Sequence, residues 1–139
     1  MIEKEHTAIA RIVLADDNPA MLDSVAEILL DADYDVVGVV CDGTCVVEEV
    51  GKAQPDIVVL DISMGDVNGL ELARALQHQN YPGKIIFLTV HEDQELLSAA
   101  IAAGGYAYIV KSRLDLDLLP AVQAVLCGEL FVSASLRCH

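Results

Sequence analysis

The sequence is short of basic residues. Only 8 Lys and Arg stand against 22 Asp and Glu, which gives a formal net charge of −14 at pH 7. A protein of that charge repels phosphate backbones and anionic lipid headgroups, so we expect this chain to bind neither nucleic acid nor membranes. The same excess of carboxylates attracts cations, including divalent metal ions.

Long apolar runs and targeting signals are also missing. The longest stretch without a formal charge runs from Leu96 to Val110, short of the roughly 20 residues that a membrane-spanning helix needs. The first 13 residues include acids and lack the basic segment and cleavage site of a secretory signal. No CxxC pair occurs among the 4 cysteines. We therefore expect reduced thiols and a cytoplasmic location.

Apolar residues are abundant. They make up 54% of the chain against 22% charged residues, which argues against an intrinsically disordered protein. A chain of 139 residues is long enough for one domain with its own core. Short runs rich in Val and Ile alternate with segments of helical periodicity, and several runs are apolar at every position, which is typical of strands buried on both faces of a parallel sheet. The predicted strands are Ile9–Ala15, Val36–Val40, Ile57–Leu60, Ile85–Val90 and Ala107–Val110.

Helix signals separate these strands. Asn18 suits an N-cap and Pro19 the first helical position, and the acidic pair ending at Asp93 opens a fourth helix that Gly104 closes. Asp117 is the expected cap of the last helix, because Pro120 is best tolerated in a first turn. A strand followed by a helix, five times over, predicts an α/β fold: a doubly wound parallel sheet with helices on both faces.

Polar residues follow the predicted strands at their carboxyl ends. Asp16 and Asp17 follow the first strand, Asp61 the third, Thr89 lies at the end of the fourth, and Lys111 follows the fifth. Ligands of open parallel sheets bind at this edge, and the loops converge if the first strand lies between the second and third. Each residue alone has an ordinary explanation, since Asp often caps a helix and Lys is usually a surface charge.

The combination predicts phosphoryl chemistry. Three crowded carboxylates raise one another's pKa values unless a cation lies among them, and an oxygen-rich site with open positions suits Mg²⁺. A nearby ammonium and hydroxyl would donate hydrogen bonds to phosphoryl oxygens. Such a site supports transfer of a phosphoryl group to a carboxylate.

Four segments in order resemble the receiver domain of bacterial two-component response regulators: LADDN, PDIVVLDISMGDVNGLEL, KIIFLTV and AGGYAYIVKS. The resemblance covers about residues 9–127. It implies a flavodoxin-like five-stranded parallel sheet in the order 2-1-3-4-5 with five helices. The expected divisions are a tail at 1–8, the receiver at 9–128, and at 129–139 either a docked tail or the start of a linker to an absent output domain.

The resemblance also assigns a metal and phosphoacceptor site. It implies that Asp61 accepts the phosphoryl group and that Lys111 reaches this group or Asp61. It implies that Asp17 binds Mg²⁺ directly, that Asp16 supports the ion largely through water, and that the backbone carbonyl of Ser63 is a further ligand. A receiver is not an enzyme toward other molecules, although it assists its own phosphorylation and dephosphorylation.

Two further positions resemble the family's switch. Thr89 is expected to shift toward the phosphoryl group, and the ring of Tyr108 to turn inward in the active state. For Tyr108 the alternative is a partly exposed aromatic packed on the fourth helix. Two positions depart from the family pattern. Gly65 replaces a usual Pro and is expected to loosen its loop, and Val90 replaces a small residue and is expected to narrow access to the phosphoryl group.

The implied partner is a sensor histidine kinase or a phosphotransfer protein, selected through first-helix residues near Ala20, Asp23, Ser24 and Glu27. The face of the fourth helix, fifth strand and fifth helix would bind a partner or a second copy in a homodimer. The end of the chain resembles receivers that precede a LuxR-type helix-turn-helix, which favours a transcriptional regulator over a free-standing receiver acting by contact or phosphorelay. A pseudo-receiver with a silent site stays open. A phosphohydrolase with an aspartate nucleophile is disfavoured, because Ser63 stands where its second acid is usual.

Overall fold

The fold is a parallel sheet between two layers of helices. The computed structural model describes residues 9–133. In this part of the chain the main sheet has the order β2-β1-β3-β6-β7-β8, and every neighbouring pair is parallel. The strands are β1 (Arg11–Ala15), β2 (Asp35–Val40), β3 (Ile57–Asp61), β6 (Lys84–Thr89), β7 (Gly105–Val110) and β8 (Phe131–Val132). The first five confirm the predicted order of strands.

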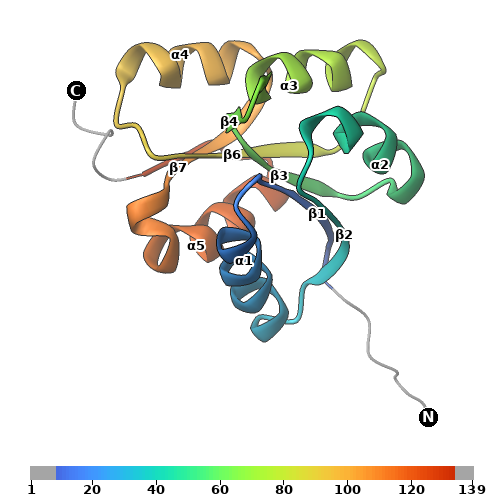
Figure 1. Ribbon diagram of the computed structural model, residues 1–139. Coiled ribbons are helices and arrows are strands. Elements are labelled where there is room, and N and C mark those ends of the chain that lie inside the picture. Colours follow the sequence, from blue (N-terminus) through green and yellow to red (C-terminus); the bar gives the residue numbers. More distant parts are fainter. Residues whose placement is uncertain (1–8, 134–139) are drawn as a thin grey trace.

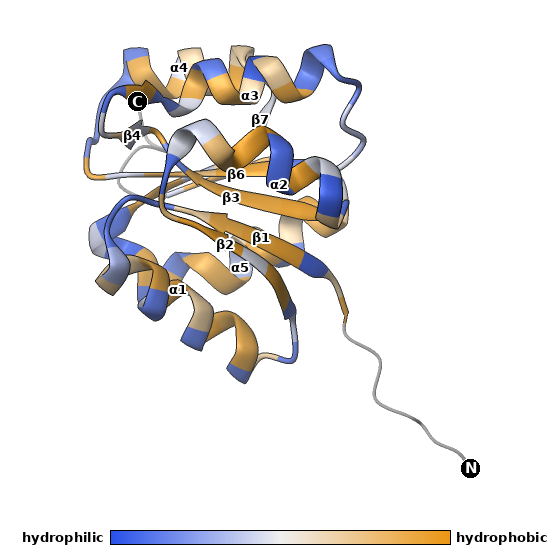
Figure 2. Ribbon diagram, turned by 45° about the vertical axis from the view of Figure 1, so that its right-hand side comes forward, coloured by the Kyte–Doolittle hydropathy of each residue, from blue (hydrophilic) through white to orange (hydrophobic). Residues whose placement is uncertain are grey.

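Helices cover both faces of the sheet. They are α1 (Pro19–Asp31), α2 (Val46–Ala53), α3 (Gly69–His78), α4 (Gln94–Ala102) and α5 (Leu114–Leu126). Figure 1 shows α2, α3 and α4 on one face and α1 and α5 on the other. Each face has its own apolar cluster, and Figure 2 shows the apolar colouring concentrated on the sheet between the layers. None of the helices within residues 9–133 is long and apolar enough to cross a bilayer.

Local sequence signals set the starts of two helices. The side chain of Asn18 accepts hydrogen bonds from the backbone N–H groups of Ala20 and Met21, and Pro19 is the first residue of α1. Asp93 caps α4 through the N–H groups of Glu95 and Leu96. The Asn18 cap confirms the prediction. Asp93 was expected only as part of the acidic start of the helix, and the structure shows that it is also the cap, since a short acceptor side chain satisfies N–H groups that have no partner within the helix.

The start of α5 corrects the prediction. Lys111–Arg113 form a short 3₁₀ turn, η2, that leads directly into α5 at Leu114. Asp117 therefore lies inside the helix and does not cap it. Pro120 also lies inside α5, on its exposed side, where water can reach the carbonyl group that Pro leaves unpaired.

A short C-terminal strand and a hairpin after β3 were also not predicted. Gly128, at φ +78°, ends α5, and the chain returns as β8 beside β7, with Phe131 opposite Ala107. The described part of the C-terminal segment is therefore docked on the sheet.

After β3, β4 (Ser63–Met64) and β5 (Val67–Asn68) form an antiparallel hairpin. Its turn contains Gly65 at φ +62°, a conformation that the Pro usual in the family cannot adopt.

Candidate functional site

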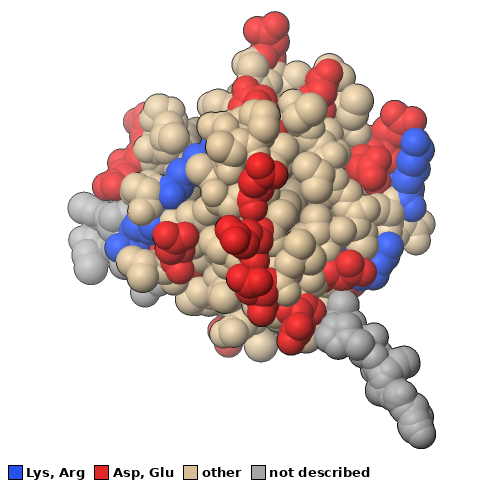
Figure 3. Space-filling view, turned by 60° about the horizontal axis from the view of Figure 1, so that its bottom comes forward, with Lys and Arg blue, Asp and Glu red and all other residues tan. Residues whose placement is uncertain are grey.

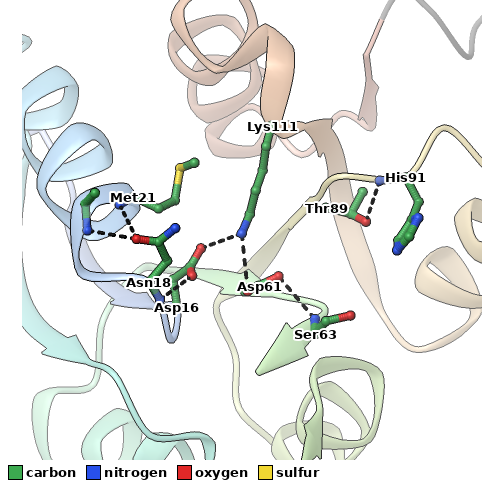
Figure 4. A network of polar contacts seen from close by, with 9 residues as sticks. Asp16, Asn18, Met21, Asp61, Ser63, Thr89, His91 and Lys111 are labelled. Atoms are coloured by element: carbon green, nitrogen blue, oxygen red, sulfur yellow. Dashed lines mark hydrogen bonds and ion pairs between the residues drawn. The ribbon is translucent and has the colours of Figure 1, made fainter. Parts of the chain in front are cut away.

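The parallel strands bring the predicted polar residues to one edge of the sheet. Asp16 follows β1, Asp61 is the last residue of β3, Thr89 is the last residue of β6, and Lys111 follows β7. Figure 4 shows Lys111 reaching down between Asp16 and Asp61, with Thr89 on the next strand. The order of β1, β3, β6 and β7 in the sheet is what makes these four side chains neighbours.

Asp61 is a buried carboxylate at the centre of this group. Its side chain accepts a hydrogen bond from the backbone N–H of Ser63, 3.1 Å from Oδ1, and its Oδ2 lies 3.3 Å from Nζ of Lys111. Burial and the charge of Asp16 raise the pKa of Asp61 to about 6. The contacts with Ser63 and Lys111 act to lower this pKa but do not outweigh the increase. The carboxylate is therefore less stable in its charged form than an exposed Asp, which favours pairing with a cation.

Lys111 supplies one positive charge to the site. Its Nζ lies 2.9 Å from Oδ2 of Asp16 and 3.3 Å from Oδ2 of Asp61. Burial acts to lower the pKa of Lys111, but its contact with Asp16 and the charges of both carboxylates outweigh this, and the net pKa is raised. The lysine is therefore an ammonium ion at neutral pH, placed to touch whatever is attached to Asp61.

The three carboxylates fit a divalent cation. Asp16, Asp17 and Asp61 each offer an oxygen, and these oxygens lie within 4.8 Å of one another. Opposite ligands of one Mg²⁺ ion are about 4.2 Å apart, so a side-chain movement of less than about 1 Å would close the set. Oδ2 of Asp16 is buried and has no hydrogen-bond partner apart from its ion pair with Lys111. An all-oxygen donor set with this under-satisfied atom suits Mg²⁺.

Thr89 and Tyr108 lie in contact behind the site. Thr89 is 2% exposed, and its hydroxyl oxygen accepts a hydrogen bond from the N–H of His91 at 3.1 Å. The ring of Tyr108 is buried, with 1% of the residue exposed, and its hydroxyl donates to the carbonyl of His91 at 3.2 Å. Burial raises the pKa of Tyr108, while a hydrogen bond with Thr89 acts to lower it. The inward ring does not match a partly exposed aromatic.

Sequence reasoning missed the residues that orient these groups. The backbone N–H of Asn18 donates to Oδ1 of Asp16 at 2.9 Å, and His91 holds both Thr89 and Tyr108 through its backbone. Backbone donors are invisible in a motif, because any residue type supplies them. A groove of about 430 Å³ adjoins the site, between the β4–β5 hairpin and the loop that holds His91.

Comparison with known proteins identifies the family. A family model of the response regulator receiver domain matches residues 12–123. The chain belongs to this family. It is 31% identical over 128 residues to the nitrate/nitrite response regulator protein NarL of Escherichia coli, covering 91% of this chain and 59% of NarL. It is 34% identical over 125 residues to the transcriptional regulatory protein DegU of Brevibacillus brevis, covering 88% of this chain and 52% of DegU.

Solved structures agree with this membership. A two-component response regulator of the LuxR family from Aurantimonas superposes with a TM-score of 0.85 at 28% identity, covering 91% of both chains. The isolated receiver domain of RcsB from Salmonella enterica, solved with the phosphomimetic BeF3-, superposes with a TM-score of 0.84 at 26% identity, covering 91% of this chain and 95% of that one. The chain is thus a receiver domain, and it spans little more than half the length of the curated relatives named above.

Proposed function

We propose that Asp61 of this receiver accepts a phosphoryl group from a phosphohistidine on a sensor histidine kinase or a phosphotransfer protein. One observation carries the proposal: the carboxylate of Asp61 lies beside two further carboxylates and the Lys111 ammonium. In the transfer, an oxygen of Asp61 forms a bond to phosphorus while the donor's phosphorus–nitrogen bond breaks. The electron pair stays on the leaving imidazole.

The residues around Asp61 account for how this transfer would be assisted. Lys111 donates to the phosphoryl oxygens and offsets their negative charge. Asp16, Asp17 and the backbone carbonyl of Ser63 would hold Mg²⁺, which supplies charge neutralisation to the transferring group when it is bound. This is self-assisted phosphorylation and dephosphorylation and not turnover of an external substrate.

Thr89 and Tyr108 would report the phosphoryl group to the surface. A phosphoryl group on Asp61 offers acceptor oxygens to the Thr89 hydroxyl, which now accepts from His91 and contacts Tyr108. When Thr89 turns toward these oxygens, the buried ring of Tyr108 loses its hydrogen bond with the Thr89 side chain. The ring then repacks into the space that Thr89 leaves. The surface of α4, β7 and α5 then changes, and we propose that it binds a partner or a second copy of the chain.

The kinase would dock on α1, which carries an acidic stripe. Asp23, Glu27 and Asp31 are all exposed and lie four residues apart along one side of α1. Figure 3, which looks toward the α1 and α5 side, shows acidic side chains running across this face. With Ala20 and Ser24, these residues offer a complementary surface to a basic helix of the phosphodonor, which would speed the encounter.

The downstream role would be control of transcription. The similarity to DegU and to a LuxR-family regulator supports a DNA-binding output domain outside these residues. We propose that the protein acts in the cytoplasm. At a net charge of −14 the chain itself is not expected to bind DNA. A gel-shift showing sequence-specific binding by these 139 residues would contradict that expectation.

Incubation with acetyl phosphate and Mg²⁺, followed by intact-mass analysis, tests the proposal. We expect one added phosphoryl group, lost in Asp61→Asn and kept in Asp66→Asn, which removes an exposed carboxylate from the hairpin turn. EDTA should prevent the addition. No addition to the wild-type chain would refute phosphoacceptance and favour a pseudo-receiver, and repeated turnover of phosphate esters would favour a phosphohydrolase.

A further inference from the structure

A buried serine ties the C-terminal strand to the end of β7. Ser133, directly after β8, is 0% exposed. Its N–H donates to the carbonyl of Tyr108, and its hydroxyl oxygen accepts from the N–H of Val110, both at 3.0 Å. The hydroxyl also donates to Oδ2 of Asp117 on α5 at 2.8 Å. One side chain therefore connects β8, β7 and α5.

Asp117 carries the connection back to the turn that contains Lys111. Nε of Arg113 donates to Oδ2 of Asp117 at 2.9 Å, and Nη2 donates to Oδ1 at 3.4 Å. Asp117 is 4% exposed, so this pair and the Ser133 hydroxyl satisfy a buried charge. Arg113 and Lys111 are the two ends of η2. The turn is thus held on both sides of its lysine: Ser133 binds the residue before Lys111, and Asp117 binds the residue two after it.

We propose that Ser133 is a positioning residue for Lys111, so that docking of β8 and occupation of the Asp61 site stabilise each other. Without the hydroxyl, the Val110 N–H and an oxygen of Asp117 each lose a buried partner, and the turn between them rearranges. Lys111 is then less well aligned on a group attached to Asp61. By thermodynamic linkage, a group that fixes Lys111 must in turn favour the docked β8. This inference rests on the proposed phosphoacceptor role of Asp61.

Hydrogen exchange in the wild-type chain tests the coupling directly. The probe is beryllium fluoride with Mg²⁺. The amides of Ser133 and Val110 report on the hydrogen bonds that join β8 to β7. We expect beryllium fluoride to slow their exchange at least about fivefold more than it slows exchange of the amides of β2, which lies at the opposite edge of the sheet. A factor of about five is the lower end of the usual range for energetic coupling between two binding sites. The β2 amides correct for general stabilisation by a bound ligand. Asp61→Asn should abolish the difference.

The reciprocal measurement uses Ser133→Ala with Ser98→Ala, an exposed serine of α4, as the matched control. We expect the affinity for beryllium fluoride to fall at least about fivefold in Ser133→Ala and to stay unchanged in the control. A merely structural serine would lower the resistance to urea without changing the affinity of the folded protein, and that result would overturn the inference. If Ser133→Ala does not fold, the exchange experiment decides alone.

The outcomes separate the two proposals. Suppose that the wild-type chain binds beryllium fluoride, but that binding slows exchange of the Ser133 and Val110 amides no more than exchange of the β2 amides. The proposed role of Ser133 is then wrong, and the proposal that Asp61 is a phosphoacceptor stands. If the wild-type chain neither binds beryllium fluoride nor takes up phosphate, the proposed function fails, and the inference fails with it.

Discussion

Replacing the central carboxylate should make the metal-free protein more stable. The pKa of Asp61 is raised from 3.8 to about 6, chiefly by burial and then by Asp16. The folded chain therefore holds the proton more tightly than the unfolded chain, and above pH 6 the ionised carboxylate lowers the free energy of unfolding. A shift of this size corresponds to about 3 kcal/mol at most, because one pKa unit is about 1.4 kcal/mol. Water and salt at this edge of the sheet screen the repulsion between Asp61 and Asp16. We therefore expect the ionised carboxylate to lower the free energy of unfolding by about 1–2 kcal/mol.

Asp61→Asn mimics the protonated acid, and urea unfolding in EDTA measures the gain. We expect the variant to be about 1–2 kcal/mol more stable than wild type at pH 7.5 and to gain less at pH 5. The gain should be nearly lost at pH 3.8 and absent below it, where the carboxyl is protonated in both the folded and the unfolded chain. Asp66→Asn should change little, because Asp66 is exposed. A loss of stability in Asp61→Asn, or a gain that does not depend on pH, would refute the electrostatic account of the site.

Three more substitutions test separate features. Asp31→Lys ends α1 with a cation and replaces the repulsion between Asp31 and Glu27 by attraction. We expect the free energy of unfolding in urea to rise by about 0.5–1 kcal/mol. No rise would show that repulsion between these carboxylates does not destabilise α1. Gly65→Ala places a side chain at φ +62° and should cost about 1–2 kcal/mol, whereas an unchanged midpoint would show that the hairpin turn adapts. Val90 is 68% exposed beside Thr89. Val90→Ala should shorten the lifetime of the aspartyl phosphate, measured by intact mass over time, and an equal lifetime would rule out a shielding role.

The site was predictable because it depends on topology more than on detail. The runs that became β1, β3, β6 and β7 are apolar enough to mark buried parallel strands, and parallel strands place their carboxyl ends on one edge. Once the order of the strands is known, Asp16, Asp61, Thr89 and Lys111 must be neighbours. The cap at Asn18 was predictable for a different reason, because an N-cap is a local interaction.

Elements fixed by tertiary contacts were not predictable. β8 has two residues, too few to show a period, and it forms because Ser133 finds partners on β7 and α5. Asp117 looked like a cap because capping is the commonest role of an Asp near a helix start. Its contacts with Arg113 and Ser133 exist only after the chain has folded. The hairpin turn at Gly65 likewise needed a backbone angle that composition does not reveal.

The two acidic features of this receiver share one physical logic. Asp61 is buried beside Asp16, and Glu27 lies one turn from Asp31 near the negative end of α1; both arrangements oppose folding in the free chain. Under the proposals made above, each would become favourable beside positive charge, from Mg²⁺ at the sheet edge and from a basic helix of the phosphodonor at α1. Violations of local rules are expected at functional sites, and both of these acidic features lie at sites to which a function is proposed above. The same Asp31→Lys change that stabilises the chain should therefore slow phosphotransfer from the histidine kinase and leave acetyl phosphate as effective as before.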